Sequence, residues 1–110
     1  KDMNSDELLS RYAAGEREFC LANLSGFNLS EVNLSGADFS QANLEQAILR
    51  RTNLSRATLS QADLGAADLR EADLRKADLS GADMVGVDLC GADLSLADLT
   101  AADLSRANLS

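Results

Sequence analysis

The stretch ADLGAADLREADLRKADL, residues 62–79, repeats a small apolar residue, an acid and a leucine every five positions. The pattern extends in both directions without an insertion or deletion, over residues 22–110. Its leucine positions, which we call the centres, run in steps of five from Leu24 to Leu109, and sixteen of the eighteen are leucine. So strict an internal period is typical of a repeat architecture, in which each repeat contacts mainly its neighbours.

A five-residue period fits neither a regular helix nor a flat strand. A helix would rotate successive centres by about 140°, and a strand would send them to alternate faces. A chain that turns after every pentad keeps the small residue and the leucine, which stand two apart, on the same inner side. The sequence therefore predicts a solenoid with an apolar core and outward Asp or Asn, and the absence of proline suits the backbone hydrogen bonds between coils.

The last two positions of each pentad predict the corners of this solenoid. They hold mostly small, polar or charged residues, and five glycines occupy the second of them: Gly26, Gly36, Gly81, Gly86 and Gly91. Glycine at one fixed place in a turn indicates a positive φ there, as in a type II turn.

The repeated triplets, of which residues 62–64 and 67–69 are examples, closely resemble the pentapeptide-repeat family. The resemblance implies a four-sided, right-handed β-helix, so the expected fold class is an all-β solenoid with a short N-terminal α-helix. We expect a helical cap over residues 1–18 and the repeats over 19–110, as parts of one domain. Residues 12–19 also resemble the cap of cyanobacterial members, which suggests a photosynthetic bacterial source.

The two ends of the solenoid differ in the sequence. Residues 4–15 predict an amphipathic helix with Ser5 as its N-cap and Gly15 as its stop, and this helix should cover the first coil above Phe19 and Phe27. The repeat runs on to Ser110, so nothing in the sequence covers the last coil. Either the chain continues in a longer protein or the last coil contacts another copy of itself; we favour a contact between two C-terminal ends and also expect the chain to be a fragment.

Composition and charge exclude several classes of protein. Ten Lys and Arg against eighteen Asp and Glu give a formal net charge of −8, which argues against a nucleic-acid partner. No run suits a membrane span or a signal peptide, so we expect no membrane partner and a cytoplasmic location, with the thylakoid lumen left open. Cys20 and Cys90 are expected to be free thiols, and no cofactor or metal set is indicated.

If four pentads form a coil, residues twenty apart stack in columns, which turns the sequence into a map of the surface. Basic residues then gather on two adjacent faces of the middle coils, and the candidate interaction surface is Arg50, Arg51, Arg70, Arg75 and Lys76. Arg51 falls in one column with Glu31 and Glu71, with alternating sign. These charges are either ordinary solvated surface or a docking patch for an acidic partner.

Outward carboxylates of the later coils form the other candidate surface. One acidic column holds Asp63, Asp83 and Asp103, and another holds Asp73 and Asp93. Stacked carboxylates repel and should have raised pKa values unless they accept hydrogen bonds. The structural interpretation is that each Asp bonds nearby backbone donors and holds its corner, and the alternatives are a functional acidic face or a divalent-ion site.

The chain lacks the residues of a catalytic site. It has no histidine, one tyrosine and no glycine-rich phosphate loop, and outward columns on a convex rod offer no cleft, so we expect no enzyme. The favoured function is a structural or protein-interaction module. The alternative, implied by the family resemblance, is a DNA mimic that binds a type II topoisomerase (DNA gyrase), although the basic mid-section departs from that pattern.

Overall fold

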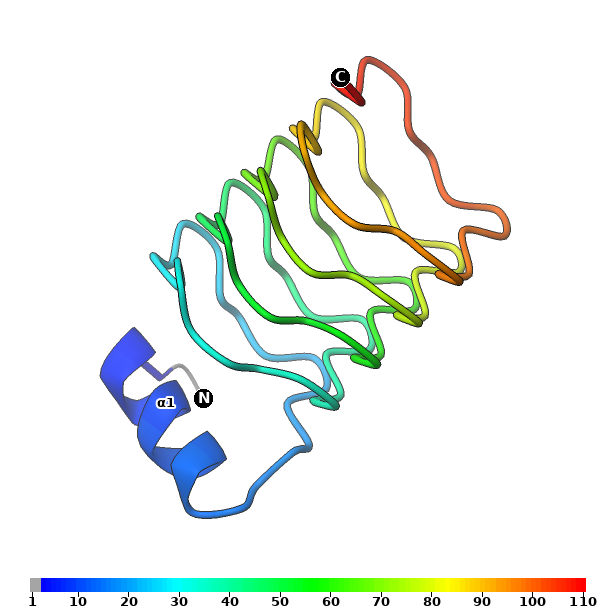
Figure 1. The fold of residues 1–110 in the computed structure, drawn as a ribbon. Coiled ribbons are helices and arrows are strands. Elements are labelled where there is room, and N and C mark those ends of the chain that lie inside the picture. The colour runs from blue at the N-terminus through cyan, green and yellow to red at the C-terminus, as the bar shows by residue number, and fades with distance from the viewer. Residues whose placement is uncertain (1–2) are drawn as a thin grey trace.

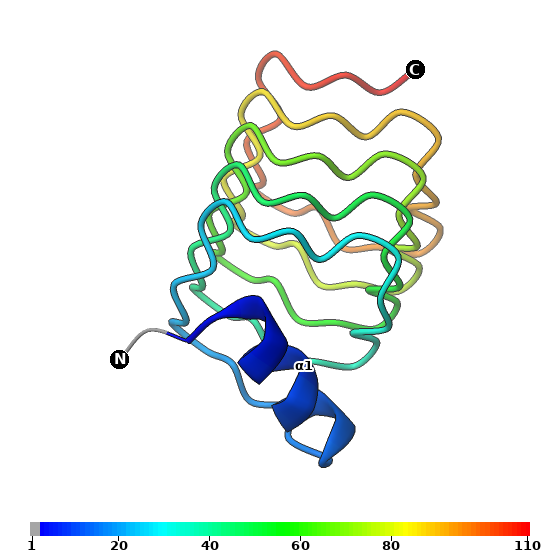
Figure 2. The same cartoon turned by 90° about the vertical axis from the view of Figure 1, so that its left-hand side faces the viewer.

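The computed structural model describes residues 3–110, which form one short helix and a stack of coils (Figure 1). The helix, α1 (Ser5–Ala13), lies across the first coil, and the coils then rise to the C-terminus at the far end (Figures 1 and 2). Over these residues no helix is long and apolar enough to cross a membrane.

The N-cap of helix α1 lies one residue earlier than predicted. Asn4, not Ser5, is the N-cap: its backbone is extended, and its Oδ1 accepts a hydrogen bond from the backbone N–H of Glu7 at 2.8 Å. The prediction of Ser5 was wrong because two adjacent residues can both cap a helix, and here the first one has the extended conformation that capping needs. Gly15 follows the helix end with a φ of 101°, in the left-handed region.

The coils repeat every twenty residues. Parallel bridges join positions twenty apart along the whole stack, as in Asn43 with Asp63 and Asp63 with Asp83. The N–H of Leu64 donates to the carbonyl of Asp83 at 2.7 Å, and the N–H of Asp63 donates to the carbonyl of Ala42 at 2.9 Å. Each coil therefore holds four pentads, and its backbone groups pair with the coils above and below.

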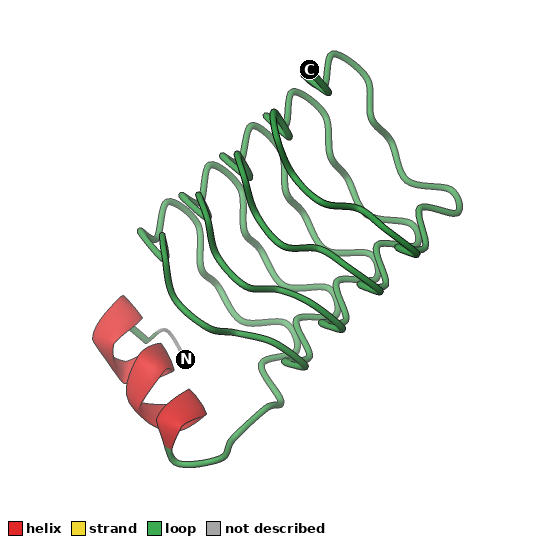
Figure 3. Ribbon diagram, in the orientation of Figure 1, coloured by secondary structure: helices red, strands yellow, loops and turns green. Residues whose placement is uncertain are grey.

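This pairing consists of isolated bridges, and residues 3–110 contain no continuous strand (Figure 3). The reason is geometric, because each pentad bends before a second consecutive residue can join the ladder. The Leu64 carbonyl, for example, accepts from the N–H of Ala67 at 3.0 Å, which closes the turn between two pentads.

Every corner has a residue in the left-handed region, as the glycines predicted. Gly86 has a φ of 72°, and Ala66, one coil below it, has a φ of 55°. Thirteen residues other than glycine have positive φ, so the backbone requirement applies to all corners and not only to those with glycine.

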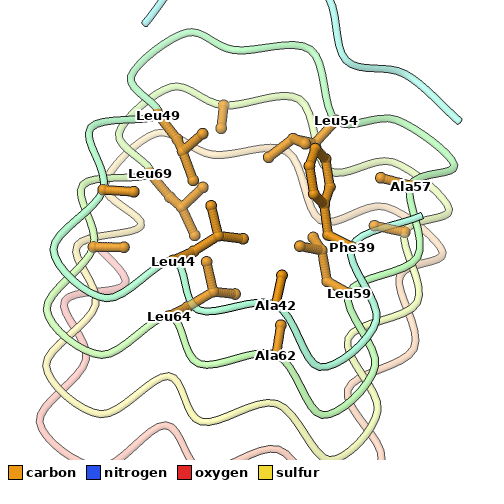
Figure 4. Close-up of a cluster of buried hydrophobic side chains, with 14 of the residues drawn as sticks. Phe39, Ala42, Leu44, Leu49, Leu54, Ala57, Leu59, Ala62, Leu64 and Leu69 are labelled. Carbon is orange, nitrogen blue, oxygen red and sulfur yellow. The ribbon is translucent and has the colours of Figure 1, made fainter. Parts of the chain in front are cut away.

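The apolar core fills the axis of the stack. Leu44 and Leu64 point inward one above the other, and Ala42 and Ala62 do the same beside them (Figure 4). All four are buried. The expectation that the small residue and the centre of each pentad share the inner side is confirmed.

The two ends are covered unequally. Leu8 of α1 is fully buried, Phe19 stacks on Phe39 with ring centroids 5.6 Å apart, and Tyr12 donates from its hydroxyl to the Ser35 carbonyl at 2.7 Å. At the other end the inward leucines are only half-buried, and Leu109 is 61% exposed. The helix thus seals the first coil, while the last coil presents apolar side chains to solvent.

Candidate functional site

The twenty-residue register brings the predicted basic residues onto neighbouring outer positions of the middle coils. Arg50 and Arg70 lie in one column, because their neighbours Ile48 and Asp68 are bridged. The Arg51 N–H donates to the Arg70 carbonyl at 2.9 Å, so these two residues belong to adjacent coils. The five residues of the candidate interaction surface do not share one environment, however, because their side chains have different partners.

Two of the arginines are held by the aspartate of their own pentad. Arg70 donates from Nε to Asp68 Oδ1 at 2.9 Å and from Nη2 to Asp68 Oδ2 at 2.7 Å. Arg75 makes the same pair of bonds to Asp73, at 2.8 and 2.7 Å. The aspartate points outward at the middle of the pentad, and the arginine two positions later starts the turn, so the guanidinium folds back onto the carboxylate. Such two-bond pairs fix the position of the arginine.

Arg51 lies between two glutamates of the adjacent coils. Its Nε donates to Glu71 Oε1 at 2.6 Å, and its Nη1 lies 3.6 Å from Glu31 Oε2. The predicted column of alternating sign is therefore present. Arg50 is held less closely, with its Nη2 3.5 Å from Asp68 Oδ2.

Lys76 differs from the four arginines. Among residues 3–110 it forms no ion pair, and neither does Arg56. The two side chains line an open depression of about 160 Å³ together with Ser55 and Arg75. Arg56 and Lys76 are thus two neighbouring cations without an ion pair, and only Lys76 belongs to the candidate interaction surface.

The arginine pairs control the protonation of their aspartates. The hydrogen bonds from Arg70 lower the pKa of Asp68 to about 2, and those from Arg75 lower the pKa of Asp73. Both carboxylates are therefore ionised throughout the neutral range.

The acidic columns are present with the predicted register. Asp63, Asp83 and Asp103 are bridged in sequence, and Asp73 is bridged to Asp93. Each of these five carboxylates accepts a hydrogen bond from the backbone N–H two residues later, at 3.0 to 3.1 Å. This contact holds the turn, as the structural interpretation of the aspartates expected.

Hydrogen bonds lower the pKa of two carboxylates in these columns. The hydroxyls of Ser95 and Ser105 each donate to the aspartate two residues earlier at 2.6 Å and lower the pKa of Asp93 and of Asp103. At Asp93 these bonds outweigh the repulsion from Asp73, so its pKa is lowered and not raised.

A second hollow lies against the acidic column. It measures about 420 Å³, and its rim includes Glu45, Asp63, Asp83 and Arg106 around the small residue Gly65. Among the described residues no group of three or more His, Cys, Asp or Glu side chains could hold a metal ion. Cys20 and Cys90 are free thiols, as predicted.

Three features of the molecule were not predicted from the sequence. The aspartate–arginine pairs could have been found from their spacing, because Asp and Arg stand two apart only where the pair forms: at Asp68-Arg70 and Asp73-Arg75. Among the described residues Arg56 and Lys76 lack an ion pair because their neighbours in the column are not acidic. This is found only when residues twenty apart are compared. Thr52, the one buried polar residue among residues 3–110, donates from its hydroxyl to the Leu29 carbonyl.

Coils of four five-residue repeats, closed by left-handed corners, define the class of pentapeptide solenoids. The model for pentapeptide repeats matches residues 19–51, 52–89 and 86–110, and the chain belongs to this family. Family members of known structure fold as right-handed β-helices. Proteins built from these repeats are generally non-catalytic structural or interaction modules.

Solved structures resemble the chain over nearly its whole length. HetL, a pentapeptide-repeat protein involved in heterocyst differentiation regulation in the cyanobacterium Nostoc sp. strain PCC 7120, is 42% identical with a TM-score of 0.81. The match covers 98% of this chain and 48% of HetL, so the chain spans about half the length of that relative. A second protein from Nostoc PCC 7120, alr5209, is 36% identical with a TM-score of 0.59, and the match covers 97% of this chain and 96% of alr5209.

A more distant structure shares the fold alone. QnrB1, a plasmid-mediated fluoroquinolone resistance protein, is 19% identical with a TM-score of 0.57, and the match covers 84% of this chain and 63% of QnrB1. No curated protein matches the chain by sequence.

Proposed function

We propose that the chain is a non-catalytic protein-interaction module, a right-handed quadrilateral β-helix that presents charged side chains at fixed positions. In this proposal residues 1–18 are the cap and residues 19–110 carry the display surface. One observation carries the proposal: the outward arginines are held by carboxylates of the same solenoid, Arg70 by Asp68 and Arg75 by Asp73.

Fixed side chains favour binding because a partner need not order them. Immobilising a flexible side chain on association costs about 0.5–1.5 kcal/mol, and a side chain already held by a two-bond ion pair has lost most of that freedom. The rigid ladder behind the surface has the same effect on the backbone. The likeness to HetL supports a regulatory role for such a surface, because HetL is described as involved in regulating differentiation.

The uncovered last coil supports a further contact with a second copy of the chain. Its inward leucines, exemplified by Leu94 and Leu104, are only half-buried. Among residues 3–110 the N–H groups of Leu94 and Leu104 also donate to no backbone carbonyl, and such an edge is a template for pairing. The free thiols favour a reducing compartment such as the cytoplasm as the site of the interaction.

Capture of partners from a cyanobacterial lysate by the folded chain tests the proposed function. The informative variant replaces Arg50, Arg51, Arg70 and Arg75 with Ser, and its far-ultraviolet circular dichroism must match that of the wild type, because these arginines also form ion pairs. Replacing Arg11, Arg17 and Arg106 with Ser is the matched control, since it removes basic residues outside the candidate interaction surface. The proposal expects a partner that the first variant loses and the control retains; a partner retained equally by both would place binding elsewhere.

A DNA mimic that binds a type II topoisomerase is the second candidate. The observation in its favour is the regular stacking of carboxylates, with Asp63, Asp83 and Asp103 in one column. The arginine pairs count against it, because Arg70 and Arg75 interrupt the negative charge of the neighbouring faces. A supercoiling assay with DNA gyrase separates the two candidates: inhibition by the wild type, together with an empty capture experiment, would favour the mimic.

A further inference from the structure

One corner of the solenoid carries two stacked cations and then an exposed leucine. The corner column consists of Gly36, Arg56, Lys76 and Leu96, which the register places on four successive coils. The Arg56 N–H donates to the Arg75 carbonyl at 2.8 Å, and the Lys76 N–H donates to the Ser95 carbonyl at 2.9 Å. Adjacent members are therefore about one strand spacing apart, close to 4.8 Å.

The two cations of this column form no ion pair among residues 3–110. The neighbouring corner shows the usual alternative, because there Arg51 lies between Glu31 and Glu71. Like charges stacked directly opposite one another are destabilising. An anionic group placed between Arg56 and Lys76 would remove this repulsion.

The space beside the two cations is suited to such a group. Arg56 and Lys76 line the depression of about 160 Å³ with Ser55 and Arg75. Arg75 already pairs with Asp73, and the Ser55 hydroxyl donates to Asn53 Oδ1 at 2.7 Å. The unpaired donors that face the depression are thus those of Arg56 and Lys76.

Leu96 extends the column with an apolar side chain. It is 81% exposed, the highest value among the large hydrophobic residues, and it has a φ of 61°. A single exposed leucine needs no explanation on a protein surface. Next to two unpaired cations, however, it completes a strip with a charged part and an apolar part.

We propose that the Arg56–Lys76–Leu96 strip docks an acidic segment of a partner protein, with carboxylates on the two cations and an apolar side chain on Leu96. This inference rests on the proposed interaction function and names the chemistry of the partner. The strip spans two strand spacings, about 10 Å, and an extended segment of five residues, with three side chains at alternate positions, is long enough to cover it. Nucleic acid fits less well, because the net charge of −8 repels a polyanion and Leu96 offers nothing to phosphate.

A short peptide titrated into the ¹⁵N-labelled chain of 110 residues tests the strip. The probe is the blocked pentapeptide Glu-Ser-Glu-Ser-Leu, whose two acids and leucine share one side when extended, and the control probe has Gln in place of Glu. The amide shifts should be confined to residues 55–57, 75–77 and 95–97. The double variant Arg56→Gln/Lys76→Gln should raise the Kd at least about tenfold, because it removes both charge-assisted contacts.

Two matched variants sharpen the result. Arg106→Gln removes another exposed corner arginine, from a different column, that forms no ion pair among residues 3–110, and it should leave the Kd within about twofold. Leu96→Ser should weaken binding of the probe without changing its salt dependence. Equal binding of the Gln probe, shifts elsewhere, tighter binding of a DNA duplex at the strip, or no shifts at millimolar probe would each overturn the inference. Lysate capture distinguishes failure of this inference from failure of the proposed function. If a partner is retained by Arg56→Gln/Lys76→Gln but lost by the variant in which Arg50, Arg51, Arg70 and Arg75 are Ser, the docking strip is wrong and the proposed interaction function still holds.

Discussion

Arg70 donates two parallel hydrogen bonds to Asp68 on the outer face of the middle coils, at 2.9 and 2.7 Å. The pair forms within one pentad and uses the aspartate that also accepts the backbone N–H of Arg70 at 3.1 Å. One carboxylate therefore fixes both a corner of the fold and a charge of the surface, so the stability of the fold and the display of charge depend on the same residue.

The first prediction concerns the loss of stability in acid. The pKa of Asp68 is lowered from 3.8 to about 2 in the folded chain, so the unfolded state binds the proton more readily. Its stabilisation is present above about pH 4 and is lost as the pH falls toward 2. Because Arg70 is 42% exposed and screened by solvent, we expect a contribution of about 1 kcal/mol to the free energy of unfolding. Chemical denaturation between pH 2 and 6 gives the free energy of unfolding at each pH. This free energy should fall less steeply toward low pH for Asp68→Asn than for the wild type. Parallel curves for the two proteins would contradict this assignment.

The second prediction compares a buried centre with an exposed one. Leu74 is fully buried at mid-stack, and Leu74→Ala should lower the free energy of unfolding by about 2–5 kcal/mol. Leu109→Ala makes the same chemical change where the side chain is 61% exposed, so its effect should stay below about 1 kcal/mol. Urea unfolding followed by circular dichroism measures both, and similar losses for the two variants would refute the burial pattern.

The third prediction uses the left-handed corners. Ala66 has a φ of 55°, which strains an L-residue but not glycine, so Ala66→Gly should raise the free energy of unfolding by about 0.5–1 kcal/mol. Gly86 lies one coil above with a φ of 72°, and Gly86→Ala should lower the free energy of unfolding by a similar amount. Neither change creates a clash, since the nearest atoms to a Cβ at Gly86 are 4.0 Å away. Thermal melts of the pair should move in opposite directions, and a shift of the same sign in both would rule out the corner strain.

The fourth prediction concerns the uncovered last coil. If it pairs with a second copy, sedimentation velocity should show a monomer–dimer equilibrium that depends on concentration. Leu104→Glu places a charge among the half-buried side chains of this coil and should leave only monomer. Leu21→Glu is the control, because Leu21 is exposed on an outer corner of the first coil. A wild type that remains monomeric at high concentration would contradict the contact.

The repetitive part of the fold could be predicted from the sequence because it follows from a single period. The inward positions of Ala62 and Leu64 require only that two residues on an extended segment share a side, and the structure confirms them. The number of pentads in a coil does not follow from the period, and it was expected from the family resemblance alone. The side chains that break the pattern were harder to place, as the cap at Asn4 illustrates.

The sequence predicted which surface residues share a column, but not all the contacts that their side chains make. The stacking of Glu31, Arg51 and Glu71 follows from the register, and the structure contains it. The spacing of Asp73 and Arg75 indicates their pair, whereas the surroundings of Lys76 depend on side-chain conformation and emerge only from the structure.

The register of twenty residues is the central claim, because every column of the surface depends on it. The native thiol of Cys20 provides the most direct test, since the Leu21 N–H donates to the Ser40 carbonyl at 3.0 Å and residues 20 and 40 therefore lie on adjacent coils. In a Cys90→Ser background, mild oxidation of Ser40→Cys should form a disulfide with Cys20 within one chain, seen as a loss of two hydrogens by intact mass spectrometry, because neighbouring coils place the two Cα atoms within disulfide range. A Ser35→Cys variant, one corner away, should remain reduced. Cross-linking at position 35 but not at position 40 would contradict the register and the surface map built on it.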